Sequence, residues 1–124
     1  MNKFLALMLG MYCTLSALEW KTYQEALELQ KKSNKLIMID VVRDNCRFCT
    51  DMDRNVFEDK EMSVWLESRF IPVKLNLDHD TLPLGIKVHF TPTFYFIDNA
   101  NAIKKKIPGS WNIEDFQSMT KDLK

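Results

Sequence analysis

Two cysteines with two residues between them, Cys46 and Cys49, are the feature of this chain that predicts a definite chemistry. A pair with this spacing can close a small disulfide ring, and its thiolate form can exchange with other disulfides. We expect Cys46 at the start of a helix, where free amide groups and the helix dipole favour an anion, and Arg47 adds a positive charge beside it. The pattern therefore predicts that Cys46 attacks a substrate disulfide and that Cys49, one helical turn further along, resolves the mixed disulfide.

Two other interpretations of the cysteine pair remain open. A purely structural disulfide is disfavoured, because so short a ring constrains little of the unfolded chain. A zinc site usually needs four ligands, and besides the two cysteines only His79 and His89 are available. The carboxylates of Asp44, Asp51 and Asp53 oppose the stabilisation of a thiolate, so the sequence does not fix the net effect on the thiol.

The first half of the chain predicts a helix, a strand and the start of a second helix around the cysteines. Thr22 and Glu25 match a capping box, so a helix is expected over residues 23–33. Residues 36–42 form an apolar run that holds one acid, Asp40, which is typical of a strand buried on both faces of a largely parallel sheet. A helix is then expected from the cysteine pair to about residue 57.

The second half of the chain predicts a similar alternation. A helix over residues 60–69, with Asp59 as its N-cap, precedes a strand over residues 71–77 with one buried face. The remaining predicted elements are a loop over 78–86, a strand over 93–97, a lysine-rich edge strand over 103–107 and a final helix capped by Asn112. Trp65 and Trp111 are assigned to the hydrophobic core.

Composition and charge fit a single globular domain. The chain has 124 residues, of which 46% are hydrophobic, and its 17 basic residues balance 17 acidic ones. A chain without excess positive charge lacks the basic field of a nucleic-acid binder, so nucleic acid is excluded as the expected partner.

Residues 1–17 predict a signal peptide, which leaves residues 18–124 as the mature domain. Lys3 precedes an apolar run of about a dozen residues, which is too short to span a bilayer. An uncleaved interfacial anchor is a second interpretation, and a lipoprotein acylated at Cys13 is a third, although the bulky Tyr12 before it argues against acylation. Export, with a periplasmic location, would place the cysteine pair where disulfides form and persist.

The arrangement of these motifs resembles the thioredoxin superfamily over about residues 20–123. The resemblance rests on the strand, C-x-x-C and helix at residues 39–49, on Thr91-Pro92-Thr93 just before a strand, and on the terminal hairpin and helix. The stretch 46–78 is similar to exported thioredoxin-like proteins related to membrane disulfide-reductase systems and to sulfur-oxidation thioredoxins. The resemblance implies an α/β thioredoxin-like fold, with a mixed central β-sheet flanked by helices on both faces.

The resemblance also assigns roles to individual residues. Cys46 matches the nucleophilic cysteine and Cys49 the resolving one. Pro92 matches a cis-proline beside the disulfide, which would let Thr91 pair with a substrate strand. Asp40 matches a buried acid beneath the active site, and a carboxylate in an apolar strand should have a raised pKa and can accept the proton of Cys49. A buried acid bonded to structural water is the alternative for Asp40.

The chain departs from the family at three positions near this site. Asn45 replaces the usual tryptophan, Arg47-Phe48 replaces the usual Gly-Pro, and Phe90 replaces a glycine common in thioredoxins. Phe48 and Phe90 are candidates for an apolar rim that contacts a substrate peptide, and local packing of the two rings is the alternative. His89 is assigned to solvent or to packing.

The sequence is compatible with two classes of function. The first is an exported thiol–disulfide oxidoreductase that acts on protein disulfides without a cofactor and is reset by a redox partner protein, such as a membrane electron donor. The resemblance favours a reductase, whereas stabilisation of the thiolate by Arg47 favours an oxidant. No separate dimerisation segment is present, so a monomer is expected. The alternative is a binding module or metallochaperone that holds a soft metal such as Cu(I) between the cysteines. The motif has only one methionine close to it, Met52, and this lack of a methionine cluster argues against the alternative.

Overall fold

Alternating helices and strands follow one another along the part of the chain that the computed structural model describes, residues 18–124. The predicted signal peptide, including Cys13, lies outside the described residues. The elements are α1 (Tyr23–Ser33), β1 (Leu36–Val42), α2 (Arg47–Met52), η1 (Asp53–Phe57), α3 (Lys60–Arg69), β2 (Phe70–Asn76), η2 (Pro83–Gly85), β3 (Thr93–Ile97), β4 (Ile103–Pro108) and α4 (Ile113–Thr120).

The strands form one mixed sheet in the order β2-β1-β3-β4. β1 and β2 are parallel, whereas β3 pairs antiparallel with both β1 and β4. This register places Asp40 of β1 between Lys74 of β2 and Phe94 of β3. The mixed sheet that the resemblance implied is confirmed, and the lysine-rich β4 lies at its edge as predicted.

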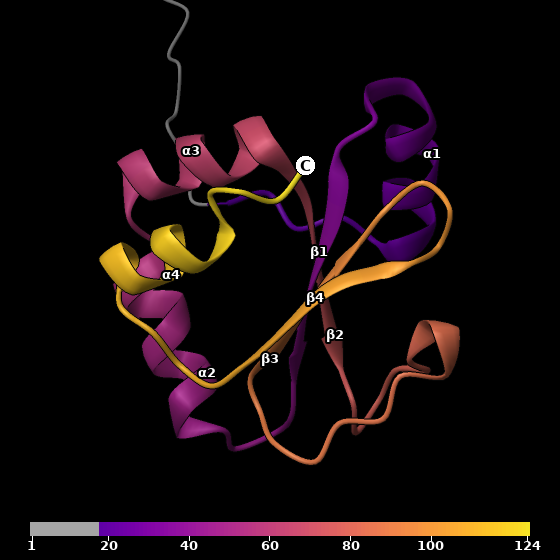
Figure 1. Cartoon of the computed structure of the whole chain (residues 1–124). Coiled ribbons are helices and arrows are strands. Elements are labelled where there is room, and N and C mark those ends of the chain that lie inside the picture. Colours follow the sequence, from indigo (N-terminus) through magenta and orange to yellow (C-terminus); the bar gives the residue numbers. More distant parts are fainter. Residues whose placement is uncertain (1–17) are drawn as a thin grey trace, which may run out of the picture.

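Helices cover both faces of the sheet. In Figure 1, α2, α3 and α4 lie on one side of the strands and α1 lies on the other. Successive side chains of β1 alternate between the two faces. Met38 therefore packs under α2, α3 and α4, and Ile39 packs under α1. Asp40 has the same parity as Met38, so its carboxyl group points to the face that α2 covers.

Side-chain caps fix where three of the helices begin, as the sequence predicts. The capping box of α1 is complete, because the Thr22 hydroxyl accepts from the Glu25 amide and the Glu25 carboxylate accepts from the Thr22 amide. Asp59 caps α3 through the amide of Met62, and Asn112 caps α4 in the same way. The helix predicted to run from the cysteines to residue 57 does so, but its last turn is the π-helix η1.

The prediction of one buried face for the strand after α3 is wrong for its first half. β2 begins at Phe70, and its first four residues, including Pro72, are buried. The segment before α1 explains this burial, since the Lys21 amide donates to the Pro72 carbonyl at 2.8 Å and Lys21 bridges to Val73. The edge of β2 is therefore covered, which the alternating pattern of the strand alone does not indicate.

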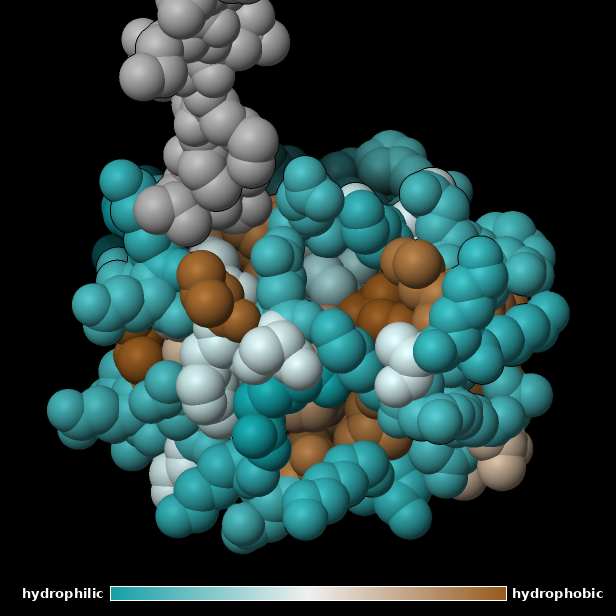
Figure 2. Space-filling model, turned by 90° about the horizontal axis from the view of Figure 1, so that it is seen from above, coloured by the Kyte–Doolittle hydropathy of each residue, from teal (hydrophilic) through white to brown (hydrophobic). Residues whose placement is uncertain are grey.

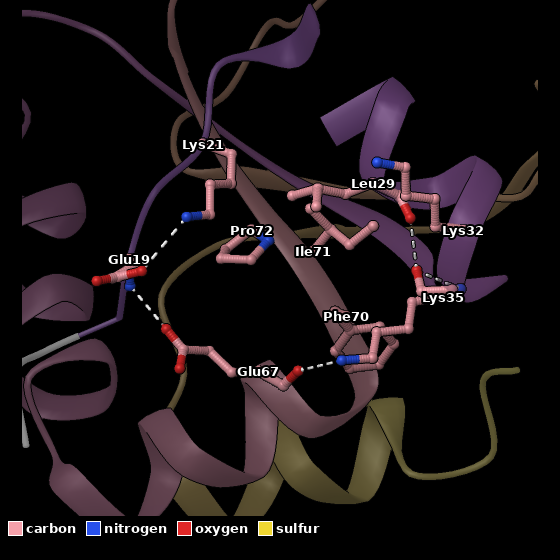
Figure 3. A pocket seen from close by; sticks show the side chains of 10 residues that line it. Glu19, Lys21, Leu29, Lys32, Lys35, Glu67, Phe70, Ile71 and Pro72 are labelled. Atoms are coloured by element: carbon pink, nitrogen blue, oxygen red, sulfur yellow. Dashed lines mark hydrogen bonds and ion pairs between the residues drawn. The ribbon is translucent and has the colours of Figure 1, made fainter. Parts of the chain in front are cut away.

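A small pocket of about 280 Å³ lies at the start of β2, beside Phe70, Ile71 and Pro72 (Figure 3). Four of the residues that line it are tied together by polar contacts: the Lys35 ammonium donates to the Glu67 carbonyl, the Glu19 amide donates to the Glu67 carboxylate, and Lys21 pairs with Glu19. Figure 2 shows the molecule from above, where apolar surface forms separate patches between hydrophilic side chains. No cysteine lines this pocket, so it is excluded as the redox site.

Candidate active site

The two cysteines of the motif form a disulfide between the end of β1 and the start of α2. Their Sγ atoms are 2.16 Å apart and their Cα atoms 5.2 Å apart. Both side chains are largely buried, with Cys46 9% exposed and Cys49 6% exposed. The site lies at the lower end of the molecule in Figure 1, where β1 turns into α2. Cys46 is the more exposed of the two, and as predicted it marks the start of the helix.

The local backbone directs the Cys46 sulfur toward hydrogen-bond donors. Asn45 has a left-handed backbone conformation with φ of 53°, which turns the chain from the strand into the helix. Cys46 is the N-cap of α2, and its Sγ accepts a hydrogen bond from the amide of Cys49 at 3.2 Å. In the reduced protein the same amide would face a thiolate, which it stabilises better than a neutral thiol.

The segment before β3 completes the site. Thr91 and Pro92 are joined by a cis peptide bond, as the resemblance implied, and both residues are buried. The Thr91 Oγ1 lies 3.3 Å from Cys46 Sγ. Since a sulfur in a disulfide carries no proton, the hydroxyl is the donor in this contact. Chain segments 45 residues apart thus meet at the disulfide.

We expect Thr91→Val to slow the attack of Cys46 on a disulfide by about tenfold at pH 7, because a hydrogen bond to a charged group contributes about 1.5 kcal/mol. The pH dependence of Cys46 alkylation by iodoacetamide measures the effect and should move to higher pH. Thr81→Val is the matched control, since Thr81 is exposed in the loop between β2 and η2. An unchanged alkylation profile in Thr91→Val would show that the hydroxyl does not stabilise the thiolate.

Asp40 is a buried acid on the same strand that leads to the disulfide. The residue is 1% exposed, and its Oδ1 has no hydrogen-bond partner. Burial raises the pKa of Asp40 to about 8, with a smaller lowering by Lys74 and a smaller raising by Asp53. The raised pKa expected from the sequence is therefore confirmed, and at pH 7 the group is mostly protonated.

Comparison with known proteins places these features in a family. A family model described as a thioredoxin-like domain matches residues 23–124. The chain belongs to this thioredoxin-like family. The fold class expected from the sequence is confirmed, and the C-x-x-C pair forms a disulfide within this domain.

The solved structures similar to this thioredoxin-like domain include three relevant ones. A thioredoxin from Thermus thermophilus is 28% identical, with a TM-score of 0.71 over 86% of this chain and 87% of that chain. The DsbH oxidoreductase is 21% identical, with a TM-score of 0.70 over 86% of this chain and 83% of the other. The oxidised C-terminal domain of DsbD from Neisseria meningitidis is 15% identical, with a TM-score of 0.65 over 86% and 100%.

Two curated relatives are similar in sequence. Anterior gradient protein 3 of Xenopus tropicalis is 27% identical over 105 residues, which cover 83% of this chain and 63% of the relative. The protein of the same name from Mus musculus is 25% identical over 105 residues, which cover 83% and 62%. The chain therefore spans slightly less than two thirds of the length of these relatives.

An ion pair borders the buried acid of this thioredoxin-like domain, and sequence reasoning missed it. The Lys74 ammonium lies 2.7 Å from Asp53 Oδ1, and it also lies 4.5 Å from the centre of the Trp20 ring. Lys74 faces Asp40 in the strand register, while Asp53 comes from η1. Asp53 thus holds an ammonium group that would otherwise be available to the Asp40 carboxylate.

We expect Asp53→Asn to lower the pKa of Asp40. The substitution removes a negative charge that raises this pKa and releases the Lys74 ammonium to stabilise the Asp40 carboxylate. Carbon NMR of the Asp40 carboxyl group as a function of pH measures the titration directly. Glu58→Gln, an exposed neighbour of η1, is the control with the same change in net charge. An unaltered Asp40 titration in Asp53→Asn would contradict the proposed competition.

A polar network ties the loop before the disulfide to the loop after β2. His79 Nε2 lies 2.7 Å from Asp44 Oδ2, and the Asn76 side-chain amide donates to Asp44 Oδ1 at 3.0 Å. These two hydrogen bonds, with that of Asn76 the larger effect, hold the pKa of Asp44 below its usual value. His79, considered above as a zinc ligand, is therefore occupied with Asp44. Among residues 18–124, no group of three or more His, Cys, Asp or Glu residues is placed to hold a metal.

Aromatic side chains are exposed around the disulfide. Phe48 and Phe90 are 56% and 54% exposed, so neither ring is buried by local packing, and both fit the apolar rim predicted from the sequence.

The assignment of Trp111 to the core is wrong, because this residue is 37% exposed. Its indole N–H donates to the Pro108 carbonyl at 3.0 Å, which holds the ring at the surface between β4 and α4. Arg47 is also exposed and lines an opening beside Cys46.

Proposed function

We propose that this protein is an exported thiol–disulfide oxidoreductase that acts on protein disulfides and works as a reductase. The observation that carries the proposal is the meeting of three elements at one point: the Cys46–Cys49 disulfide, the Thr91 hydroxyl and the cis-Pro92. A static disulfide would not require a buried, unpartnered acid on the strand that leads to it, as Asp40 is.

The first step of the proposed reaction is attack by Cys46. In the reduced protein, the Cys46 thiolate forms a bond to one sulfur of the substrate disulfide, and the other substrate sulfur leaves as a thiolate. The amide of Cys49 and the Thr91 hydroxyl stabilise the thiolate before it reacts. Thr91 and Pro92 contact the substrate segment, and the exposed ring of Phe48 extends this contact surface.

The second step resolves the mixed disulfide. Asp40 in its carboxylate form accepts the proton of Cys49, whose thiolate then attacks Cys46 and restores the internal disulfide. The substrate leaves with its second sulfur reduced, so one substrate disulfide gains the two electrons that the cysteine pair loses. A dithiol of a redox partner protein reduces the pair again.

Export and the reductive direction are part of the proposal. Export is supported by the predicted signal peptide, and an exported chain reaches a compartment in which disulfides form and persist. Neighbours in structure include SoxS, a periplasmic thioredoxin from Paracoccus pantotrophus. Within residues 18–124, no helix has the length and apolar character needed to cross a bilayer.

Reduction of insulin by the purified protein with dithiothreitol tests the activity, and a redox titration against glutathione tests the direction. A potential near that of thioredoxin, about −270 mV, would support the reductase, and one near about −120 mV would support an oxidant. Absence of both insulin reduction and exchange with glutathione would overturn the proposed enzyme. Stoichiometric copper or zinc in anaerobically purified protein, lost in Cys46→Ser, would instead support the metallochaperone.

A further inference from the structure

A groove of about 720 Å³ runs between α2 and the segment that leads into α4, and it reaches the C-x-x-C motif at Phe48. Phe48, one of the two residues between the cysteines, lines the groove, and so do Trp111 and Ile113 from the segment that leads into α4. Phe48 is more than half exposed and Trp111 more than a third. Exposed aromatic residues next to a reactive centre are characteristic of surfaces that bind other proteins.

The charged residues that line this groove are all acidic. Asp51 and Glu114 line it from opposite walls, and no basic residue does. Within residues 18–124, neither carboxylate takes part in an ion pair. The opening on the other side of the disulfide differs, because Arg43 and Arg47 line it and its acids, Asp44 and Asp53, already have partners. Charge is therefore distributed unevenly around the cysteine pair.

We propose that this groove binds a cationic residue of the substrate segment, with an apolar residue between it and the reacting cysteine. The apolar side chain would lie against Phe48 and Trp111, and the cation would lie between Asp51 and Glu114, where aromatic faces add to its stabilisation. This inference rests on the proposed function and adds a substrate preference to it.

For a substrate segment that runs along α2, the helix geometry gives the distance between the cation and the reacting cysteine of the substrate. Asp51 follows Cys46 by five residues, which corresponds to about 7.5 Å along a helix axis. An extended substrate segment advances about 3.3 Å per residue. The lysine or arginine should therefore lie two or three residues from the reacting cysteine of the substrate.

Two peptides that differ in one residue test the proposal. Each contains one cysteine as a mixed disulfide with thionitrobenzoate, a leucine beside it, and either lysine or glutamate two residues away. Reduced protein attacks the peptide sulfur, and the released thionitrobenzoate anion reports the rate. We expect the lysine peptide to react about tenfold faster at low salt, which corresponds to about 1.4 kcal/mol, and the difference to shrink at 1 M salt.

Variants of the two carboxylates make the test specific. The double variant Asp51→Asn/Glu114→Gln should react equally with both peptides, and its rate with the small uncharged disulfide of 2-mercaptoethanol corrects both rates for any change in the reactivity of Cys46. The double variant Glu61→Gln/Asp122→Asn changes the net charge equally at exposed positions outside the groove and should keep the preference. Equal rates for both peptides in the wild type, or a preference that survives in Asp51→Asn/Glu114→Gln, would overturn the inference and leave the proposed function intact. No reaction of the wild type with any of the three disulfides would overturn the proposed function, and the inference with it.

Discussion

Replacement of Cys46 by serine is expected to reduce the rate of disulfide reduction by several orders of magnitude, because a hydroxyl group at neutral pH does not replace a thiolate nucleophile. Serine keeps the size of the side chain and can still accept from the amide of Cys49, so the start of α2 should be preserved. Insulin reduction measures the loss, and circular dichroism of the variant checks that the fold remains. Turnover close to that of the wild type would contradict the role of Cys46.

The partner cysteine should give a different result. In Cys49→Ala the first attack by Cys46 can still occur, but nothing resolves the product, so a mixed disulfide between protein and substrate should accumulate. Non-reducing mass spectrometry identifies this adduct and its site. The double variant Cys46→Ser/Cys49→Ala should form none. An adduct on Cys49 in the single variant Cys46→Ser, together with none on Cys46 in Cys49→Ala, would reverse the two assignments.

Much of the fold was predictable because its determinants are local. The apolar run of β1 and the caps Thr22, Asp59 and Asn112 each act within a few residues, so their patterns predict the elements that the structure contains. The disulfide was predictable for the same reason, since its cysteines are three residues apart. The resemblance to a family supplied the cis bond before Pro92, which no local pattern would indicate.

Features that depend on contacts distant in sequence were not predictable. The ion pair of Lys74 with Asp53 requires both the register of β2 against β1 and the position of η1 over the sheet. The exposure of Trp111 depends on how the chain leaves β4 toward α4, because an aromatic residue near a helix start is compatible with either environment. The sequence also did not show that Asp51 and Glu114 lie on opposite walls of one groove.

The same strand register explains why the buried acid and the reactive disulfide are coupled. β1 carries Asp40 under α2 and then ends in the loop that holds Cys46, so burial of the strand keeps the carboxyl group away from water. An unpartnered carboxyl group in such a place costs stability, which a purely structural strand would avoid with an apolar residue. The cost is consistent with a catalytic use of Asp40 as the acceptor of the Cys49 proton.

Asp40→Asn should therefore increase stability while it decreases activity. In the wild type the pKa of Asp40 is about 8 in the folded state, against 3.8 as the ordinary value. Between these pH values the unfolded chain has lost the proton and the folded chain has kept it, so stability falls by about 1.4 kcal/mol per pH unit as the pH rises. At pH 7 the buried Asp40 therefore lowers the free energy of unfolding by about 4 kcal/mol, and asparagine, which does not titrate, removes this loss.

Chemical denaturation of the oxidised proteins from pH 5 to pH 8 measures this effect. The stability of Asp40→Asn relative to the wild type should grow with pH up to about 8 and then become constant. Asp122→Asn, an exposed carboxylate after α4, is the control and should show no such growth. A constant difference over the whole range would mean that the folded state does not hold a proton on Asp40.

The activity of Asp40→Asn distinguishes a catalytic role of the Asp40 carboxyl group from a purely structural one. Without a carboxylate to accept the proton of Cys49, resolution of the mixed disulfide should slow by about a hundredfold at pH 7, while the first attack by Cys46 proceeds at its usual rate. Rapid-mixing kinetics with a mixed-disulfide peptide measure the two steps separately. The deficit should shrink at high pH, where Cys49 loses its proton to hydroxide. If both steps retained their wild-type rates in Asp40→Asn, the buried carboxyl group would be a structural acid without a part in the reaction.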